Sequence, residues 1–288
     1  MTLRRKMLRI FEQDHFNFLL TNCIPRHSLT LFMSWFSKIE QPLIRDLSIG
    51  AWRVFANLDL SEAKKQKFRS MHDCFVRELK DDARPIDGRP DILVSPCDAI
   101  VGACGEIGGA EVLQIKGSSY LLHELLHDEE LVEAHREGCY ATLRLLSSMY
   151  HHFHAPHDCH IDQVTYISGD VWNVNPAALR RVEKLYCKNE RAVIRCKLRG
   201  NDQPITLVPV AAVLVASMRF DFLDVALGLT YGGPDIFACK AGLKKGQHMG
   251  WFEQGSTIIV FAPKGFCLYE GVGNGTHLRV GEPLMRLP

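Results

Sequence analysis

Residues 253–261 read Glu-Gln-Gly-Ser-Thr-Ile-Ile-Val-Phe, so a polar turn leads directly into a run of β-branched and aromatic side chains. Such runs are typical of strands, because branched side chains pack well on a pleated surface. Similar runs occupy residues 162–167, 192–198 and 205–215. The sequence therefore predicts a largely antiparallel β core in the C-terminal part of the chain.

The N-terminal part has a helical pattern instead. Apolar residues at 29, 32, 33 and 36 fall on one helix face after the candidate cap Ser28, and positions 43, 47 and 51 repeat the pattern after Pro42. Ser61 marks a third predicted helix that reaches about Val76. We expect an α+β protein, with N-terminal amphipathic helices over residues 1–80 and a β-rich domain over residues 81–288.

The composition is that of a folded protein with a sizeable core: 288 residues, 47% hydrophobic, 23% charged and a net charge of +1. The near-neutral charge argues against a nucleic-acid partner. Ten cysteines contain no C-x-x-C pair, which indicates free thiols in a reducing compartment.

Membrane contact is predicted to be peripheral, because no apolar run approaches the roughly 18 residues that a spanning helix needs. Basic residues at 4, 5, 6 and 9 precede apolar residues at 16, 18, 19 and 20, a pattern suited to a membrane interface. The alternative is that these apolar faces pack on the β core. Glu12 and Asp14 end the basic start too early for a clear organelle-targeting segment.

The pair Gly255-Ser256 offers a specific chemistry. Glycine has no Cβ to block an approach, so the Ser256 hydroxyl can attack the Gly255 carbonyl and convert the peptide bond to an ester. Elimination of the ester leaves a dehydroalanine, which hydrolyses with loss of ammonia to a pyruvoyl group. Gly-Ser pairs are also common in ordinary turns, so this interpretation depends on a base and an acid elsewhere.

Candidates for both lie far upstream. Residues 150–160 contain five of the 13 histidines, and histidine is the side chain best suited to proton transfer near neutral pH. Asp98 follows a predicted strand at residues 91–94 in a turn that carries Pro96, and beside His154 it could fix the imidazole tautomer. Pro156 predicts that the histidine tract ends a secondary-structure element or forms a turn. The histidines and Cys159 are too densely spaced to define a tetrahedral metal site.

Six segments together resemble phosphatidylserine decarboxylase proenzymes, from about Phe75 to the C-terminus. They read Arg-Pro-Ile-Asp (84–87), Ser-Pro-Cys-Asp (95–98), Tyr-His-His-Phe-His-Ala-Pro (150–156), Lys-Asn-Glu-Arg (188–191), Lys-Gly-Gln-His-Met-Gly (245–250) and Gly-Ser-Thr (255–257). The resemblance implies a self-cleaving proenzyme with Asp98, His154 and Ser256 as its processing triad. It implies that His151 assists decarboxylation.

The resemblance further implies cleavage into a β chain, 1–255, and an α chain, 256–288, that begins with a covalent pyruvoyl group made from Ser256. This group would serve as the electron sink, with no dissociable cofactor and no metal. The substrate would be phosphatidylserine and the product phosphatidylethanolamine. The enzyme would lie on a membrane surface, at the cytoplasmic face of a bacterial cell membrane or, alternatively, at the mitochondrial inner membrane. Whether the enzyme forms a homodimer is left open by the resemblance.

Three residues depart from the usual family pattern: Ala99 where glycine commonly follows the aspartate, Gln254 where leucine often precedes Gly-Ser-Thr, and His152. None removes a group that the mechanism requires.

Three alternatives remain at this point. His123, Glu124 and His127 form a literal H-E-x-x-H motif, which on a helix could bind zinc in a metallopeptidase. A related pyruvoyl enzyme could act on a small soluble amino acid. A non-catalytic lipid-binding protein is the third, although it would have little reason to keep Asp98, His154 and Ser256 together.

Overall fold

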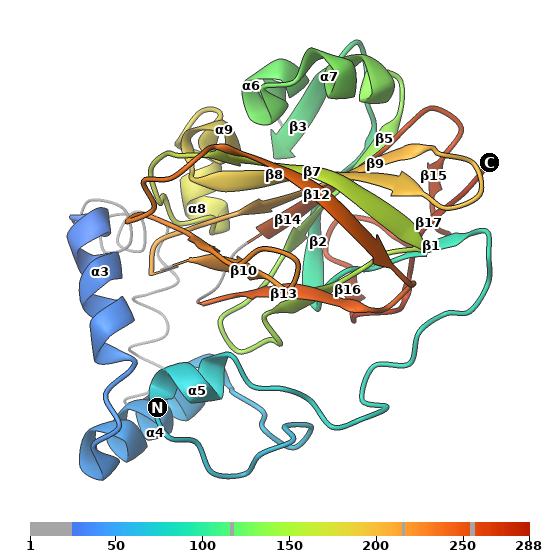
Figure 1. The fold of residues 1–288 in the computed structure, drawn as a ribbon. Helices are drawn as coiled ribbons and strands as arrows, with labels where there is room; N and C mark the ends of the chain where they lie inside the picture. The colour runs from blue at the N-terminus through green and yellow to red at the C-terminus, as the bar shows by residue number, and fades with distance from the viewer. Residues whose placement is uncertain (1–24, 116–117, 215–216, 254–256) are drawn as a thin grey trace, which may run out of the picture.

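The computed structural model describes residues 25–115, 118–214, 217–253 and 257–288. Within these ranges a group of helices precedes a body of antiparallel sheets (Figure 1), which confirms the predicted α+β class. The helices lie along one side of the β body rather than between its sheets. The basic and aromatic residues at positions 4–20 fall outside the described ranges.

The three described N-terminal helices are α3 (Arg26–Phe36), α4 (Pro42–Ala56) and α5 (Met71–Phe75). Helix α3 begins at Arg26, before the predicted cap Ser28, whereas α4 begins at Pro42, as the sequence indicates. The Gln41 side chain accepts a hydrogen bond from the Ile44 amide and so caps α4. None of the described helices is long and apolar enough to cross a bilayer.

The helix predicted from Ser61 is wrong. Residues 61–70 contain no helix, and α5 starts only after Ser70, whose hydroxyl accepts from the Asp73 amide. The chain instead folds back on itself, because Ala63 forms an antiparallel bridge with Leu79. A tertiary pairing therefore overrides the local helical pattern.

The largest sheet has eight strands in the order β12-β7-β8-β9-β14-β5-β2-β16, and all of its pairs are antiparallel. Its strands are β2 (Ala99–Glu106), β5 (Cys139–Arg144), β7 (Cys159–Ile167), β8 (Arg191–Leu198), β9 (Pro204–Val210), β12 (Ile236–Leu243), β14 (Thr257–Ala262) and β16 (His277–Leu278). The predicted runs at 162–167, 192–198 and 257–261 lie within β7, β8 and β14. The run predicted at 205–215 forms a strand only as far as Val210, where β9 ends, and residues 211–214 are outside any strand.

Three smaller sheets complete the body. The four-stranded sheet contains β6 (His152–His154), β10 (Met218–Phe220), β11 (Ala226–Leu227) and β13 (His248–Phe252), in the order β11-β10-β13-β6. The three-stranded sheet contains β1 (Ile92–Val94), β15 (Cys267–Leu268) and β17 (Pro283–Arg286), and β3 (Glu111–Ile115) pairs with β4 (Ser118–Leu121).

Strand β14 lies inside the eight-stranded sheet, with all six of its residues buried. Ile258 and Val260 pack in the core between this sheet and the four-stranded sheet. Ile259 and Phe261 face the opposite side and pack in a second core. That second core is covered by four short helices, α6 (Leu122–Leu126), α7 (Glu129–His135), α8 (Pro176–Leu179) and α9 (Leu185–Lys188).

We expect Gly250→Ala to destabilise the protein, because strand β13 runs between β10 and β6 at this glycine. A Cβ there would lie 2.1 Å from the Arg219 carbonyl oxygen and 2.9 Å from the Phe153 ring. Overpacking of this kind costs about 1–3 kcal/mol of unfolding free energy, measurable by urea denaturation. Gly50→Ala is the matched control, because the added Cβ meets nothing within 4 Å on helix α4. Equal stability of the two variants would contradict the packing argument.

Candidate active site

Gly255 and Ser256 lie outside the described residues, so the predicted cleavage site is defined by its flanks. On one side the Glu253 carboxylate is buried and accepts from the Ser217 hydroxyl (2.8 Å) and the Arg219 Nε (3.1 Å). On the other side Thr257 lies between Arg144 of β5 and Val210 of β9. Both flanks of the predicted cleavage site are therefore held in place.

His151 is fully buried directly before strand β6. Its Nδ1 lies 2.9 Å from the Met149 carbonyl oxygen, and because a carbonyl only accepts, Nδ1 carries the hydrogen. The Nε2 atom is then an acceptor, and it has no hydrogen-bond partner among the described residues. Burial, assisted by the charge of Arg77, lowers the pKa of His151 to about 3. The His151 ring packs on the Phe75 ring, with the two ring centroids 4.0 Å apart.

His154 ends strand β6 and is neutral for the same reason. Its Nδ1 donates to the Gly246 carbonyl oxygen (2.9 Å), and its Nε2 accepts from the Tyr150 hydroxyl (3.2 Å). Burial lowers the pKa of His154 to about 4, although the bond to Gly246 acts in the opposite direction. The Gly246 carbonyl thus sets the tautomer in this structure, the role that the sequence assigned to Asp98.

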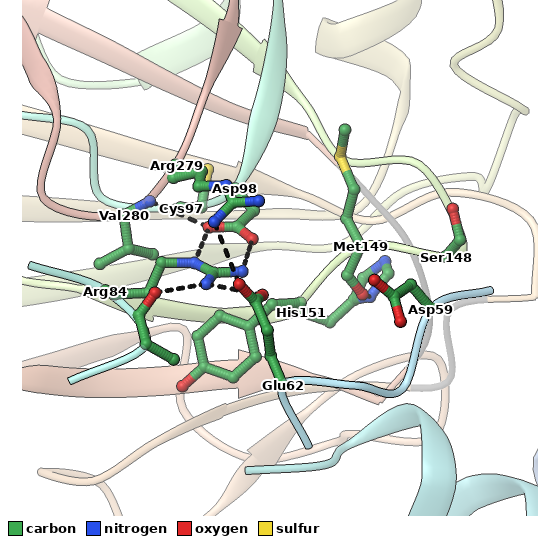
Figure 2. Close-up of polar contacts among 12 residues, drawn as sticks. Asp59, Glu62, Arg84, Cys97, Asp98, Ser148, Met149, His151, Arg279 and Val280 are labelled. Carbon is green, nitrogen blue, oxygen red and sulfur yellow. Dashed lines mark hydrogen bonds and ion pairs between the residues drawn. The ribbon is translucent and has the colours of Figure 1, made fainter. Parts of the chain in front are cut away.

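Asp98 is buried, and three donors hold its carboxylate (Figure 2). The Arg84 guanidinium bonds both oxygens, with Nε–Oδ1 at 2.8 Å and Nη2–Oδ2 at 2.5 Å, and the Val280 amide donates to Oδ1 at 2.9 Å. The His154 amide donates to the Pro96 carbonyl oxygen at 2.8 Å, which brings the histidine strand beside the Asp98 turn. The described polar contacts of Asp98 and His154 go to other groups, although their backbone segments are adjacent.

A second histidine pair lies beside His154. His152 Nε2 donates to the Val76 carbonyl oxygen (3.1 Å), so its Nδ1 accepts from His248 Nε2 at 2.7 Å. His248 Nδ1 lies 2.6 Å from an oxygen of the Asp221 carboxylate. The pair ties β6 to β13 through side chains, in addition to the backbone ladder.

Two cavities flank this group. One, of about 340 Å³, is mostly apolar and lies between the N-terminal helices and the β body; it is lined by residues that include Met33, Trp52, Phe75, Leu145 and Ala212. The other, of about 320 Å³, is polar; its lining includes Arg77, Arg84, Asp98, Tyr150 and Arg279. Phe75 connects the first cavity to the catalytic candidates, because its ring contacts His151.

Comparison with known proteins assigns the chain to a protein family. A family profile described as phosphatidylserine decarboxylase matches residues 71–286. This chain belongs to the phosphatidylserine decarboxylase family. Proteins named phosphatidylserine decarboxylase proenzyme from Saccharophagus degradans and Aliivibrio salmonicida are each 33% identical over 276 residues, covering 93% and 91% of this chain and 96% and 95% of their own lengths. One from Haemophilus influenzae is 33% identical over 274 residues, covering 91% of this chain and 92% of its own.

The family assignment does not favour the zinc peptidase, and neither does the local structure. Helix α6 ends at Leu126, and His127 follows in the left-handed conformation (φ 51°), so the motif does not lie on one continuous helix. Glu124 is paired with Lys184 at 2.5 Å. Among the residues placed by the structure, no three His, Cys, Asp or Glu side chains are grouped to hold a metal.

Sequence reasoning missed several polar partners in this decarboxylase-family site. Arg84 and Tyr150 stand inside the quoted motifs, yet neither was given a role. The pairing of His152 with His248 joins residues 96 positions apart, although the departure at His152 was a signal that its environment differs. The contact with the Gly246 carbonyl oxygen could not be predicted, because it involves no side chain of Gly246.

The depressed histidine pKa values predict a pH-dependent stability. Burial is the largest cause at His135 and His154, with pKa values of about 4, and at His151 and His152, with pKa values of about 3. These side chains titrate near 6.5 in the unfolded chain, so below that pH the unfolded state binds more protons than the folded state. The unfolding free energy should therefore fall as the pH drops from about 7 to about 5, by up to roughly 1.4 kcal/mol per pH unit for each histidine.

Urea unfolding across this pH range measures the slope. His135 lies away from the site, and its Nε2 bonds the Thr206 hydroxyl at 2.8 Å. His135→Gln should therefore flatten the slope by the share of one histidine without touching the catalytic candidates. A stability that does not change between neutral and mildly acidic pH would contradict the buried, neutral state of these rings.

Proposed function

We propose that this chain is a proenzyme that cuts itself between Gly255 and Ser256, and that the resulting pyruvoyl enzyme converts phosphatidylserine to phosphatidylethanolamine and carbon dioxide. The observation that carries the proposal is the neutral, oriented state of His154. Its Nε2 is an unprotonated acceptor held by contacts at both ring nitrogens. In a member of this family, such a nitrogen is suited to take the proton of the Ser256 hydroxyl.

The proposed cleavage proceeds through an ester and a dehydroalanine to the pyruvoyl group. His154 accepts the Ser256 hydroxyl proton while the oxygen attacks the Gly255 carbonyl carbon. The protonated His154 then gives this proton to the peptide nitrogen, which leaves as an amine while the ester forms. A base then removes the Ser256 Cα proton, and the Gly255 carboxylate departs with the electrons of the carbon–oxygen bond. Water replaces the nitrogen of the dehydroalanine, which is released as ammonia. Asp98 is proposed to stabilise the imidazolium that forms on His154.

His151 is proposed to serve the decarboxylation rather than the cleavage. A pyruvoyl group supplies a ketone that draws electrons from the substrate carbon losing its carboxylate. His151 fits a proton-transfer role there, because its Nε2 is buried, unprotonated and unpartnered within the described part of the chain. Its neighbour Phe75 lines the apolar cavity, so a substrate entering by that route would pass close to the imidazole.

A phospholipid substrate fits the exposed apolar surface of the N-terminal helices. Of the 13 exposed large hydrophobic residues described, eight lie on α3 and α4: Leu31, Phe32, Trp35, Leu43, Ile44, Leu47, Val54 and Phe55. An apolar surface of this kind suits insertion into a membrane interface. Met33 and Trp52 on the same helices line the apolar cavity, which supplies a route from the lipid to the site.

The proposed organisation follows from these roles. Residues 1–80 would associate with the membrane, and residues 81–288 would form the catalytic domain, which divides after cleavage into β chain 1–255 and α chain 256–288. We propose a peripheral enzyme at the cytoplasmic face of a bacterial membrane.

Variants separate the two histidine roles. We expect His154→Ala and Ser256→Ala to remain uncut, because one lacks the base and the other the nucleophile. His151→Ala should be cut normally but turn over about 10²–10⁴-fold more slowly, the usual effect of losing a general acid or base. Gel electrophoresis follows cutting, and release of labelled carbon dioxide follows turnover.

His157→Ala is the control, because this histidine belongs to the same tract but bonds the Pro90 carbonyl oxygen (2.9 Å) away from the site. It should be cut and active. An active Ser256→Ala protein would remove the pyruvoyl proposal, and full activity of His151→Ala would remove His151 from the mechanism.

Membrane binding is tested by reducing the exposed apolar surface. The Trp35 and Leu47 side chains are 64% and 66% exposed. Since a buried side chain of this size contributes about 1.5–3 kcal/mol, the double substitution Trp35→Ser with Leu47→Ser should weaken vesicle binding at least about tenfold. Ile236→Ser is the control, because Ile236 is 61% exposed on β12. Equal loss in both proteins would argue against a specific membrane face.

A further inference from the structure

Arg84 is the partner that fixes the orientation of the Asp98 carboxylate. Its Nε and Nη2 atoms bond the two carboxylate oxygens at 2.8 and 2.5 Å, the parallel two-point geometry that only a guanidinium provides. Both side chains are about 10% exposed. A pair this enclosed is weakly screened by water, so the contact restricts the carboxylate more than a surface ion pair would.

The third nitrogen of Arg84 anchors the guanidinium from the other side. Nη1 donates to Glu62 Oε2 (2.8 Å) and to the Ala83 carbonyl oxygen (2.6 Å). Glu62 in turn accepts from Arg279 Nη1 at 3.1 Å. Arg84 therefore cannot turn away from Asp98 without breaking bonds to the N-terminal segment that carries Glu62, as Figure 2 shows.

The contacts also determine which part of the carboxylate stays available. A carboxylate offers about four acceptor positions, two on each oxygen. Oδ1 accepts from Arg84 and from the Val280 amide, and Oδ2 accepts from Arg84. Among the described donors, one position on Oδ2 is left for a further hydrogen bond. Asp98 lines the polar cavity together with Tyr150.

We propose that Arg84 is a positioning residue for self-cleavage, which holds Asp98 so that one acceptor position of Oδ2 is presented to the reaction. Glu62 supports it by holding the far side of the guanidinium. This inference rests on the proposed function, because it requires that Asp98 take part in cutting. Arg84 would then assist self-cleavage in addition to the proposed triad of Asp98, His154 and Ser256.

The test follows self-cleavage of freshly translated full-length chains in a cell-free system, by gel electrophoresis over time. Arg84→Ala should slow cutting at least about 100-fold, and Arg84→Lys at least about tenfold, because an ammonium cannot bond both oxygens in parallel. Arg279→Gln is the matched control. It breaks only the outer contact with Glu62 at a side chain that is 59% exposed, and it should change the rate less than about twofold.

Chemical rescue distinguishes positioning from a purely structural role. The polar cavity beside Arg84 and Asp98 can admit a small cation, so millimolar guanidinium chloride, far below the denaturing range, should restore cutting in Arg84→Ala at least about tenfold. The same salt should not restore Asp98→Asn. If Arg84→Ala does not fold, Arg84→Lys decides: slowed cutting with an unchanged thermal midpoint supports the proposal.

Each contrary result has its own meaning. Normal cutting in Arg84→Lys and Arg84→Ala, with Asp98→Asn blocked, would overturn this inference and leave the proposed triad in place. Normal cutting in Asp98→Asn would overturn the role of Asp98 and this inference with it. A folded, uncut Arg84→Ala chain that guanidinium does not restore would assign Arg84 a structural role only.

Discussion

The site depends on strand β14, which is buried on both faces and begins one residue after the proposed nucleophile. Ile258 and Val260 pack in one core and Ile259 and Phe261 in the other, so the strand cannot slip by one residue without exchanging both sets. Its hydrogen-bond ladders to β5 and β9 hold Thr257 in register. The proposed rearrangement of the Gly255–Ser256 peptide bond benefits from this rigidity, because a fixed strand limits the movement of the residue that follows the nucleophile.

Burial also decides the protonation of the histidines of strand β6 and the residue before it. An imidazolium in an apolar environment lacks solvation, so His151 and His154 stay neutral and each gives its one hydrogen to a backbone carbonyl. The remaining nitrogens are therefore unprotonated: Nε2 of His154 accepts from the Tyr150 hydroxyl, and Nε2 of His151 has no partner among the described residues. The pair of His248 with Asp221 is partly exposed, and the His248 ring contacts the His154 ring edge-on at a centroid distance of 5.3 Å.

Much of the fold could be predicted from the sequence, because the strand signal is local. β-Branched runs identified β7, β8, β9 and β14, and Pro42 identified the start of α4. The helix expected from Ser61 failed because the bridge between Ala63 and Leu79 is a tertiary contact that no local pattern reveals. Asp98, His151 and His154 were predicted as site residues from the motifs. The hydrogen-bond partners of these residues could not be predicted. Every residue has a backbone carbonyl, so the sequence does not single out that of Gly246, and the Arg84 contact depends on how two loops approach each other.

The most direct test of the central claim is denaturing mass spectrometry of the purified protein. Self-cleavage with pyruvoyl formation predicts a fragment from Ser256 to Pro288 whose mass is one ammonia lower than that of the same peptide beginning with serine. The companion fragment should end at Gly255 with a free carboxylate. A single intact chain, or a C-terminal fragment that begins with an unmodified serine, would contradict the account.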